Sequence, residues 1–171
     1  MYQTLKLILA TGIKTEAPPQ ADDSLRVARE RLQNEILQYF AGALTIRHVD
    51  AGSCNGCELE INALGNPYYN LEGLGIKFVA SPRHADMLLV TGPVSRHMEV
   101  ALKRTYEATP EPKLVVALGD CGCTGGIFGE SYASCGRVSN VIPVDVAVPG
   151  CPPTPFAIMQ GILTAISTRK G

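Results

Sequence analysis

Residues 114–121 read Leu114-Val-Val-Ala-Leu-Gly-Asp-Cys121, an apolar run that stops at a glycine and is followed by a cysteine. A β-rich run of this kind, bounded by glycine, predicts a strand. Two further β-rich runs, residues 44–49 and 144–148, lead into Cys54 and Cys151 in the same way. The sequence therefore predicts three separate strands that each release a cysteine at their carboxyl end.

Strand and helix patterns alternate on both sides of this stretch. β-rich runs occur at residues 44–49, 76–80, 87–90, 114–118 and 144–148, and helical patterns occur at 58–63, 96–108 and 154–167. Such alternation is typical of a mostly parallel sheet covered by helices on both faces. We expect an α/β fold with a flavodoxin-like sheet over residues 45–171, preceded by an N-terminal helical extension.

Residues 1–44 are predicted to form this extension. A loop at residues 16–23 precedes a stretch, residues 25–40, in which apolar residues recur at helical spacing. Ser24 can cap that helix. The helix can pack on its own domain or dock on a partner subunit, and its mixed polar face makes a lipid surface the weaker option.

Composition excludes several classes of protein. The chain has 171 residues and a net charge of −1, which gives no electrostatic case for a nucleic-acid partner. No apolar run reaches the roughly 20 residues that span a bilayer, and the short apolar start, broken by Lys6, is a poor signal peptide. We expect the cytoplasm or the cytoplasmic face of a membrane complex, where six cysteines favour metal or redox chemistry over disulfides.

Four of these cysteines follow predicted strands. Cys54 and Cys57 form a Cys-Asn-Gly-Cys pair after the first strand, and Cys121 and Cys151 follow the fourth and fifth. In an open α/β sheet the carboxyl ends of the strands form one rim, at which ligands bind. We therefore expect these four cysteines to meet at one place.

Four interpretations of the cysteines remain open on spacing alone. The four can hold one [4Fe–4S] cluster or a structural zinc ion. The Cys54–Cys57 pair alone can act as a thioredoxin-like dithiol, and all can be ordinary small buried residues. Cys123 competes with Cys121 as a ligand, but Cys121 is favoured because it follows its strand more directly. Cys135 is expected to be a free thiol.

A set of motifs resembles a known family. The motifs are Asp50-Ala-Gly-Ser-Cys54-Asn-Gly-Cys57-Glu58, Ser81-Pro-Arg-His-Ala-Asp86, Val90-Thr-Gly-Pro93, Gly119-Asp-Cys121 with Gly125-Gly126, and Ile142-Pro-Val-Asp-Val146 running into Pro149-Gly-Cys-Pro-Pro153. They resemble the small subunit of energy-converting, membrane-bound (group 4) [NiFe] hydrogenases and the homologous small, cluster-bearing subunit of respiratory complex I. The Cys54-Asn-Gly-Cys57 spacing is the hydrogenase pattern, because complex I subunits carry adjacent cysteines there.

The resemblance implies a function and a set of partners. One [4Fe–4S] cluster on the four cysteines would pass electrons between a ferredoxin-like subunit and the NiFe centre of a separate large subunit. Membrane subunits would couple hydrogen evolution or oxidation to ion movement. A complex I-like quinone- or sulfur-reducing enzyme is the alternative, and a zinc-stabilised binding module is the alternative from another class.

Three more residues are candidates under this resemblance. Glu58 is a hypothetical proton relay at the subunit interface, although a carboxylate at a helix start also fits a purely structural role. Arg83 and His84 lie in a segment that the resemblance places near the cluster, where a cation raises the reduction potential. A turn that bonds backbone carbonyls is the alternative for these two residues.

Overall fold

Five parallel strands form one sheet in the computed structural model, which describes residues 2–12, 23–40 and 43–168. The strands are β1 (Leu44–Asp50), β2 (Ile76–Phe78), β3 (Met87–Thr91), β4 (Leu114–Leu118) and β5 (Val146–Val148). Their spatial order is β2-β1-β3-β4-β5, which is the flavodoxin-like order of doubly wound sheets. The predicted α/β fold is confirmed.

Six α-helices accompany the sheet within the described residues. They are α1 (Tyr2–Thr11), α2 (Asp23–Tyr39), α3 (Gly56–Ala63), α4 (Arg96–Ala108), α5 (Gly119–Thr124) and α6 (Pro155–Thr168), with 3-10 turns η1 (Glu72–Leu74), η2 (Pro82–His84) and η3 (Val138–Asn140). The sequence pattern predicts α2, α3, α4 and α6 and misses α1 and α5. No helix in the described ranges is long and apolar enough to cross a membrane.

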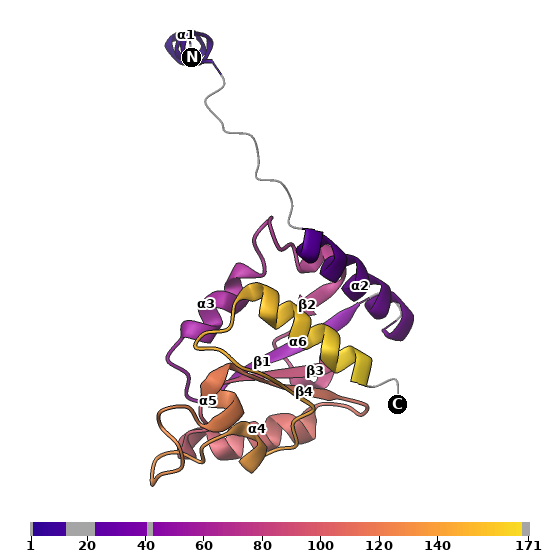
Figure 1. Cartoon of the computed structure of the whole chain (residues 1–171), viewed down its shortest axis with the longest axis vertical. Helices are drawn as coiled ribbons and strands as arrows, with labels where there is room; N and C mark the ends of the chain where they lie inside the picture. Colours follow the sequence, from indigo (N-terminus) through magenta and orange to yellow (C-terminus); the bar gives the residue numbers. More distant parts are fainter. Residues whose placement is uncertain (1, 13–22, 41–42, 169–171) are drawn as a thin grey trace.

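The two central strands are buried along their whole length. Every residue of β3 and of β4 is buried, which matches their continuous apolar sequences. Burial on both faces is possible because α2, α3 and α6 cover one face of the sheet and α4 covers the other (Figure 1). Strand β5 begins at Val146, two residues later than the predicted run of residues 144–148. At Asp145 the side chain takes the place of a strand contact, since the Val115 N–H donates to Asp145 Oδ2 at 2.7 Å.

Helix α2 is part of this core rather than a separate extension. Leu25, Leu32 and Ile36 are buried in the same cluster of apolar side chains as strands β1 and β4 and helix α6. The sequence pattern places a boundary after residue 44, but α2 packs against α6 and covers one face of the sheet. Of the two uses predicted for this helix, the structure shows packing on its own chain. The predicted loop at 16–23 lies almost wholly outside the described residues.

The strand register brings the carboxyl ends to one level. Asp50 pairs with Thr91, Thr91 pairs with Leu118, and Leu118 pairs with Val148. The segments that follow these residues therefore leave the sheet at one edge. The cysteines stand on those segments.

Candidate metal centre

The four cysteines line one cavity of about 120 Å³ at the carboxyl edge of the sheet. Cys54 stands on the loop before α3, Cys57 in the first turn of α3, Cys121 in α5 and Cys151 on the loop after β5. The remaining lining residues are Ser53, Gly56, Gly92, Asp120, Gly150 and Pro152. Three chain segments that are distant in sequence thus bring their cysteines to one site, which we call the cysteine cavity, and Gly92 after β3 adds a fourth segment to its lining.

The other two cysteines do not line this cavity. Cys123 is a residue of α5, and its Sγ lies 3.6 Å from the backbone oxygen of Ala117 in β4. Cys135 is buried and its Sγ lies 3.3 Å from Glu99 Oε2, against α4. Cys121 rather than Cys123 therefore faces the cavity, as its position after the strand predicts.

Burial disfavours a negative charge on the inner thiols. Burial raises the pKa of Cys57 to about 12, and Glu58 and the other three cysteines of the cavity also contribute to this rise. Burial also raises the pKa of Cys121, with smaller contributions from Cys151 and Cys54. Four thiolates can share this space only if cations compensate their charge, and bound metal ions supply that compensation.

The space around the thiols suits a bulky inorganic group. A Cβ added at Gly119 would lie 2.7 Å from Cys57 Sγ, and one added at Gly126 would lie 2.8 Å from Cys121 Sγ. Among the described residues, no three Cys, His, Asp or Glu side chains are placed to hold a single metal ion. Four thiols around one cavity match the one cysteine per iron that a [4Fe–4S] cubane takes, and they also equal the four ligands of a structural zinc ion.

A carboxylate shapes the loop that carries Cys54. Asp50 Oδ1 accepts hydrogen bonds from the backbone N–H groups of Gly52 and Ser53, both at 2.8 Å. Asp50 is the last residue of β1, so these bonds turn the chain at the strand end. The turn delivers Cys54 to the cavity.

Glu58 is held by hydroxyl groups from two segments. Ser53 Oγ donates to Glu58 Oε2 at 2.7 Å, and Thr91 Oγ1 donates to Glu58 Oε1. His48 Nε2 lies 3.0 Å from Thr91 Oγ1 and 3.5 Å from Glu58 Oε1. Burial lowers the pKa of His48 although Glu58 opposes this effect, so a neutral His48 can donate Nε2–H to Thr91. Sequence analysis identifies Glu58 but does not connect it to Ser53, which precedes it by five residues, or to Thr91 and His48, which stand on two different strands.

The structure does not bring Arg83 and His84 to the cysteines. Both lie in η2, which precedes β3, and Thr45 Oγ1 at the start of β1 donates to the His84 backbone oxygen at 2.6 Å. The length of β3, about 16 Å for its residues, separates this end of the sheet from the cysteine edge. The expectation that they lie beside a cluster is therefore not met, because η2 precedes its strand whereas the cysteines follow theirs.

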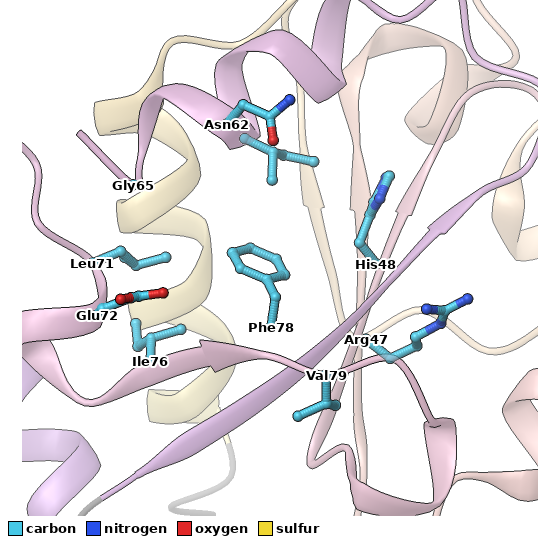
Figure 2. Close-up of a pocket in the computed structure, with 10 residues that line it drawn as sticks. Arg47, His48, Asn62, Gly65, Leu71, Glu72, Ile76, Phe78 and Val79 are labelled. Atoms are coloured by element: carbon cyan, nitrogen blue, oxygen red, sulfur yellow. The ribbon is translucent and has the colours of Figure 1, made fainter.

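A second, larger cavity of about 350 Å³ lies between α3, β1 and β2 and contains no cysteine. Figure 2 shows Phe78 between Leu71 and Ile76 on one side and His48 on the other, with Asn62 across from it. This cavity is thus separate from the cysteine cavity, although His48 borders it and also reaches Thr91.

Comparison with known proteins shows which family the chain belongs to. Residues 54–165 match the family model described as NADH ubiquinone oxidoreductase, 20 Kd subunit, and this range contains all four cysteines of the cavity. The chain belongs to this family. The resemblance read from the sequence motifs is confirmed.

Relatives of the chain include hydrogenase subunits. The chain is 47% identical over 141 residues to a probable membrane-bound hydrogenase subunit, mbhJ, of Pyrococcus furiosus, covering 81% of this chain and 84% of that one. It is 42% identical over 157 residues to formate hydrogenlyase subunit 7 of Escherichia coli, covering 92% of this chain and 59% of that one.

A solved structure extends the comparison to a third kind of enzyme. It is the membrane-bound sulfane sulfur reductase (MBS), an archaeal respiratory membrane complex, in which one chain is 36% identical to this one. The match covers 81% of this chain and 75% of that one, with a TM-score of 0.65. Together, the family and its members make this chain a subunit of an electron-transferring oxidoreductase of the hydrogenase and complex I type.

Proposed function

We propose that this chain is the electron-transfer small subunit of a membrane-bound [NiFe] hydrogenase complex and carries one [4Fe–4S] cluster on Cys54, Cys57, Cys121 and Cys151. The observation that carries the proposal is the cysteine cavity, in which thiols from three separate segments face one space. When bound, a cluster there supplies one-electron transfer between a ferredoxin-like subunit and the NiFe site of the large subunit, during hydrogen evolution or oxidation.

The chain's own residues hold and seal this group. Cys57 is buried and Cys121 half-buried, whereas Cys54 and Cys151 are exposed. One side of the cavity therefore faces the protein interior and the other opens to the surface. A redox partner can approach a bound group from the open side, while the inner side excludes water.

The surface beside Cys121 favours a protein partner there. Ile127 is 94% exposed, Phe128 is 56% exposed and Tyr132 is 98% exposed. Ile127 directly follows Gly126, which packs against Cys121. Large apolar side chains that are grouped at the surface are typical of protein interfaces. We assign this surface to the NiFe-type large subunit.

The remaining partners follow from the relatives. The P. furiosus relative is named as a subunit of a membrane-bound hydrogenase. We therefore assign this chain to the cytoplasmic face of the cell membrane, as a peripheral subunit that works with membrane subunits that move ions. Glu58 keeps its proposed role as a proton relay, held in place by Ser53 and Thr91.

A second function is favoured by one specific observation. The sulfane sulfur reductase complex contains a chain with 36% identity to this one, so the same kind of subunit serves an enzyme of sulfur chemistry. In this alternative the cysteine cavity holds the same cluster, and the partner subunit reduces a sulfur compound or a quinone instead of protons.

Metal analysis of the native complex tests the proposal. The complex is purified anaerobically, and iron, nickel and zinc are assayed for each copy of this chain. About four irons attributable to this chain, with nickel in the complex, support the hydrogenase function, because one cubane holds four irons. Iron without nickel favours the sulfur or quinone alternative. Zinc without iron contradicts electron transfer and leaves a zinc-stabilised binding module.

Serine variants assign the ligands. Cys151→Ser is expected to lose the cluster signal in the electron paramagnetic resonance (EPR) spectrum of the reduced complex, because its thiol lines the cavity. Cys135→Ser is the matched control, since its thiol is also free but lies against Glu99 outside the cavity. Equal signals from the two variants would contradict the assignment.

A further inference from the structure

Asp120 joins two of the segments that carry cysteines. Its backbone N–H donates to the Gly150 carbonyl oxygen at 2.8 Å, and the Gly150 N–H donates back to Asp120 Oδ1 at 2.7 Å. Asp120 immediately precedes Cys121, and Gly150 immediately precedes Cys151. Both Asp120 and Gly150 also line the cysteine cavity. A closed pair of hydrogen bonds therefore sits one residue away from two of the thiols.

This pair continues the contact between the two segments beyond the end of the β4–β5 ladder, whose last pair is Leu118 and Val148. Cys121 and Cys151 are far apart in sequence, and each follows a different strand. The bond from Gly150 ends on a carboxylate, and hydrogen bonds to a charged acceptor are shorter and stronger than neutral ones. The Asp120 carbonyl oxygen accepts a further hydrogen bond from Thr124 Oγ1 at 2.9 Å, which holds Asp120 within α5.

We propose that Asp120 is a positioning residue that sets the spacing of the Cys121 and Cys151 thiols. This inference rests on the proposed cluster. It adds that the Asp120 side chain holds two of the cluster's proposed ligands, Cys121 and Cys151, at a fixed spacing. Asp120 acts through Oδ1 as a hydrogen-bond acceptor, so an uncharged acceptor of the same shape keeps the two segments joined. Loss of the acceptor frees the Gly150 segment and allows the two thiols to separate.

The chain offers a matched control at the other end of the same strand. Asp145 Oδ2 accepts from the Val115 N–H at 2.7 Å, and the Asp145 N–H donates to the Val115 oxygen at 2.9 Å. This is the same double pairing of an aspartate with a backbone segment that is distant in sequence. It lies near the start of β4, whereas Asp120 follows the end of β4. Asp145→Ala thus removes an equivalent bond far from the cysteines.

The test compares Asp120→Asn, Asp120→Ala and Asp145→Ala in the anaerobically purified native complex. The measurements are iron per copy of this chain, the EPR line shape after reduction, and the rate at which an added chelator removes iron. Asp120→Ala is expected to lose iron about tenfold to a hundredfold faster than the unmodified protein, as expected for loss of a hydrogen bond to a charged group. Asp120→Asn is expected to restore the iron content and line shape and to release iron more slowly than Asp120→Ala, because it keeps the acceptor but not its charge. Asp145→Ala is expected to leave all three measurements unchanged.

Any result that differs from these expectations contradicts a defined part of the proposal. If Asp120→Ala releases iron at the unmodified rate with the same line shape, Asp120 does not position the thiols. If Asp120→Asn behaves like Asp120→Ala, the charge matters and the acceptor does not. If Asp145→Ala releases iron as fast as Asp120→Ala, the effect is general destabilisation. If the unmodified protein itself holds no iron, the proposed function fails instead.

Discussion

Gly119 offers the sharpest test of the cysteine cavity. Its φ is 81°, and the Cβ that alanine would add lies 2.7 Å from Cys57 Sγ. Gly129 is the matched control: its φ is 54°, and among the described residues nothing lies within 4 Å of an added Cβ. Gly119→Ala and Gly129→Ala therefore introduce the same kind of backbone strain, and only the first crowds a proposed ligand.

The expected costs follow from these two geometries. An alanine held at positive φ costs roughly 1–2 kcal/mol at either position. At Gly119 the new contact falls about 1 Å short of ordinary van der Waals separation, and such overpacking costs about 1–3 kcal/mol more. That difference corresponds to about 5-fold to 150-fold in an equilibrium constant. The crowding can be relieved by rotating Cys57 Sγ, which would turn the thiol away from the cavity.

Iron content separates the two variants. Both complexes are purified anaerobically, and iron and acid-labile sulfide are measured for each copy of this chain, together with the EPR spectrum after reduction. Gly129→Ala is expected to keep the iron and the spectrum of the unmodified protein. Gly119→Ala is expected to lose iron or to show an altered spectrum. If both variants hold the same iron with the same spectrum, Cys57 is not a ligand in the geometry described here.

Four other predictions concern single side chains. Leu32→Ala should lower the free energy of unfolding by about 2–5 kcal/mol, because Leu32 is 1% exposed and lies in the core. Val27→Ala, on the exposed side of α2, should lower it by less than about 0.5 kcal/mol. Urea titration of the full chain measures both values. Arg83→Met should leave the midpoint potential of the cluster unshifted in a redox titration, since β3 separates it from the cysteines; a clear downward shift would restore the tuning role. Glu58→Gln should lower the rate of proton reduction by the complex while the EPR spectrum stays the same. An unchanged rate would contradict the role of Glu58 as a proton relay. Burial raises the pKa of Cys123 to about 11, so the reactive thiolate is scarce below pH 11. Iodoacetamide should therefore modify Cys123 slowly in this pH range, and fast labelling of Cys123 at pH 8 would contradict the expectation.

The sheet was predictable because its strands are apolar in sequence. β4 and β3 read as continuous apolar runs, and the observed bounds differ from the predicted ones by at most two residues at either end. Helix α5 was not predictable in this way. Its sequence, Gly-Asp-Cys-Gly-Cys-Thr, contains two glycines, which disfavour a helix, so the surrounding strands and η3 must impose its conformation.

The cavity was predictable for a different reason. Once the strands are placed, parallel pairing sends every following segment to one edge, so cysteines directly after strands must come together. Two of the contacts that support the site, Asp120 with Gly150 and Thr91 with Glu58, were not predictable, because the partners are distant in sequence. Thr91 reads only as the end of an apolar strand, yet its hydroxyl binds Glu58, which lies 33 residues away.

The position of Arg83 and His84 relative to strand β3 explains why they lie away from the cysteines. The family resemblance placed their segment near the cluster, but the segment precedes β3, whereas each cysteine segment follows its strand. In a parallel sheet these two positions are opposite edges, so the rule that gathers the cysteines also keeps this turn away from them. Within this chain, a positive charge that tunes the cluster would have to stand on a segment that follows a strand. The described residues that line the cysteine cavity include one charged side chain, Asp120, which is negative. Arg83 and His84 are not among the residues that line the cavity, so the redox titration of Arg83→Met tests directly whether the opposite edge of the sheet has any influence on a group bound there.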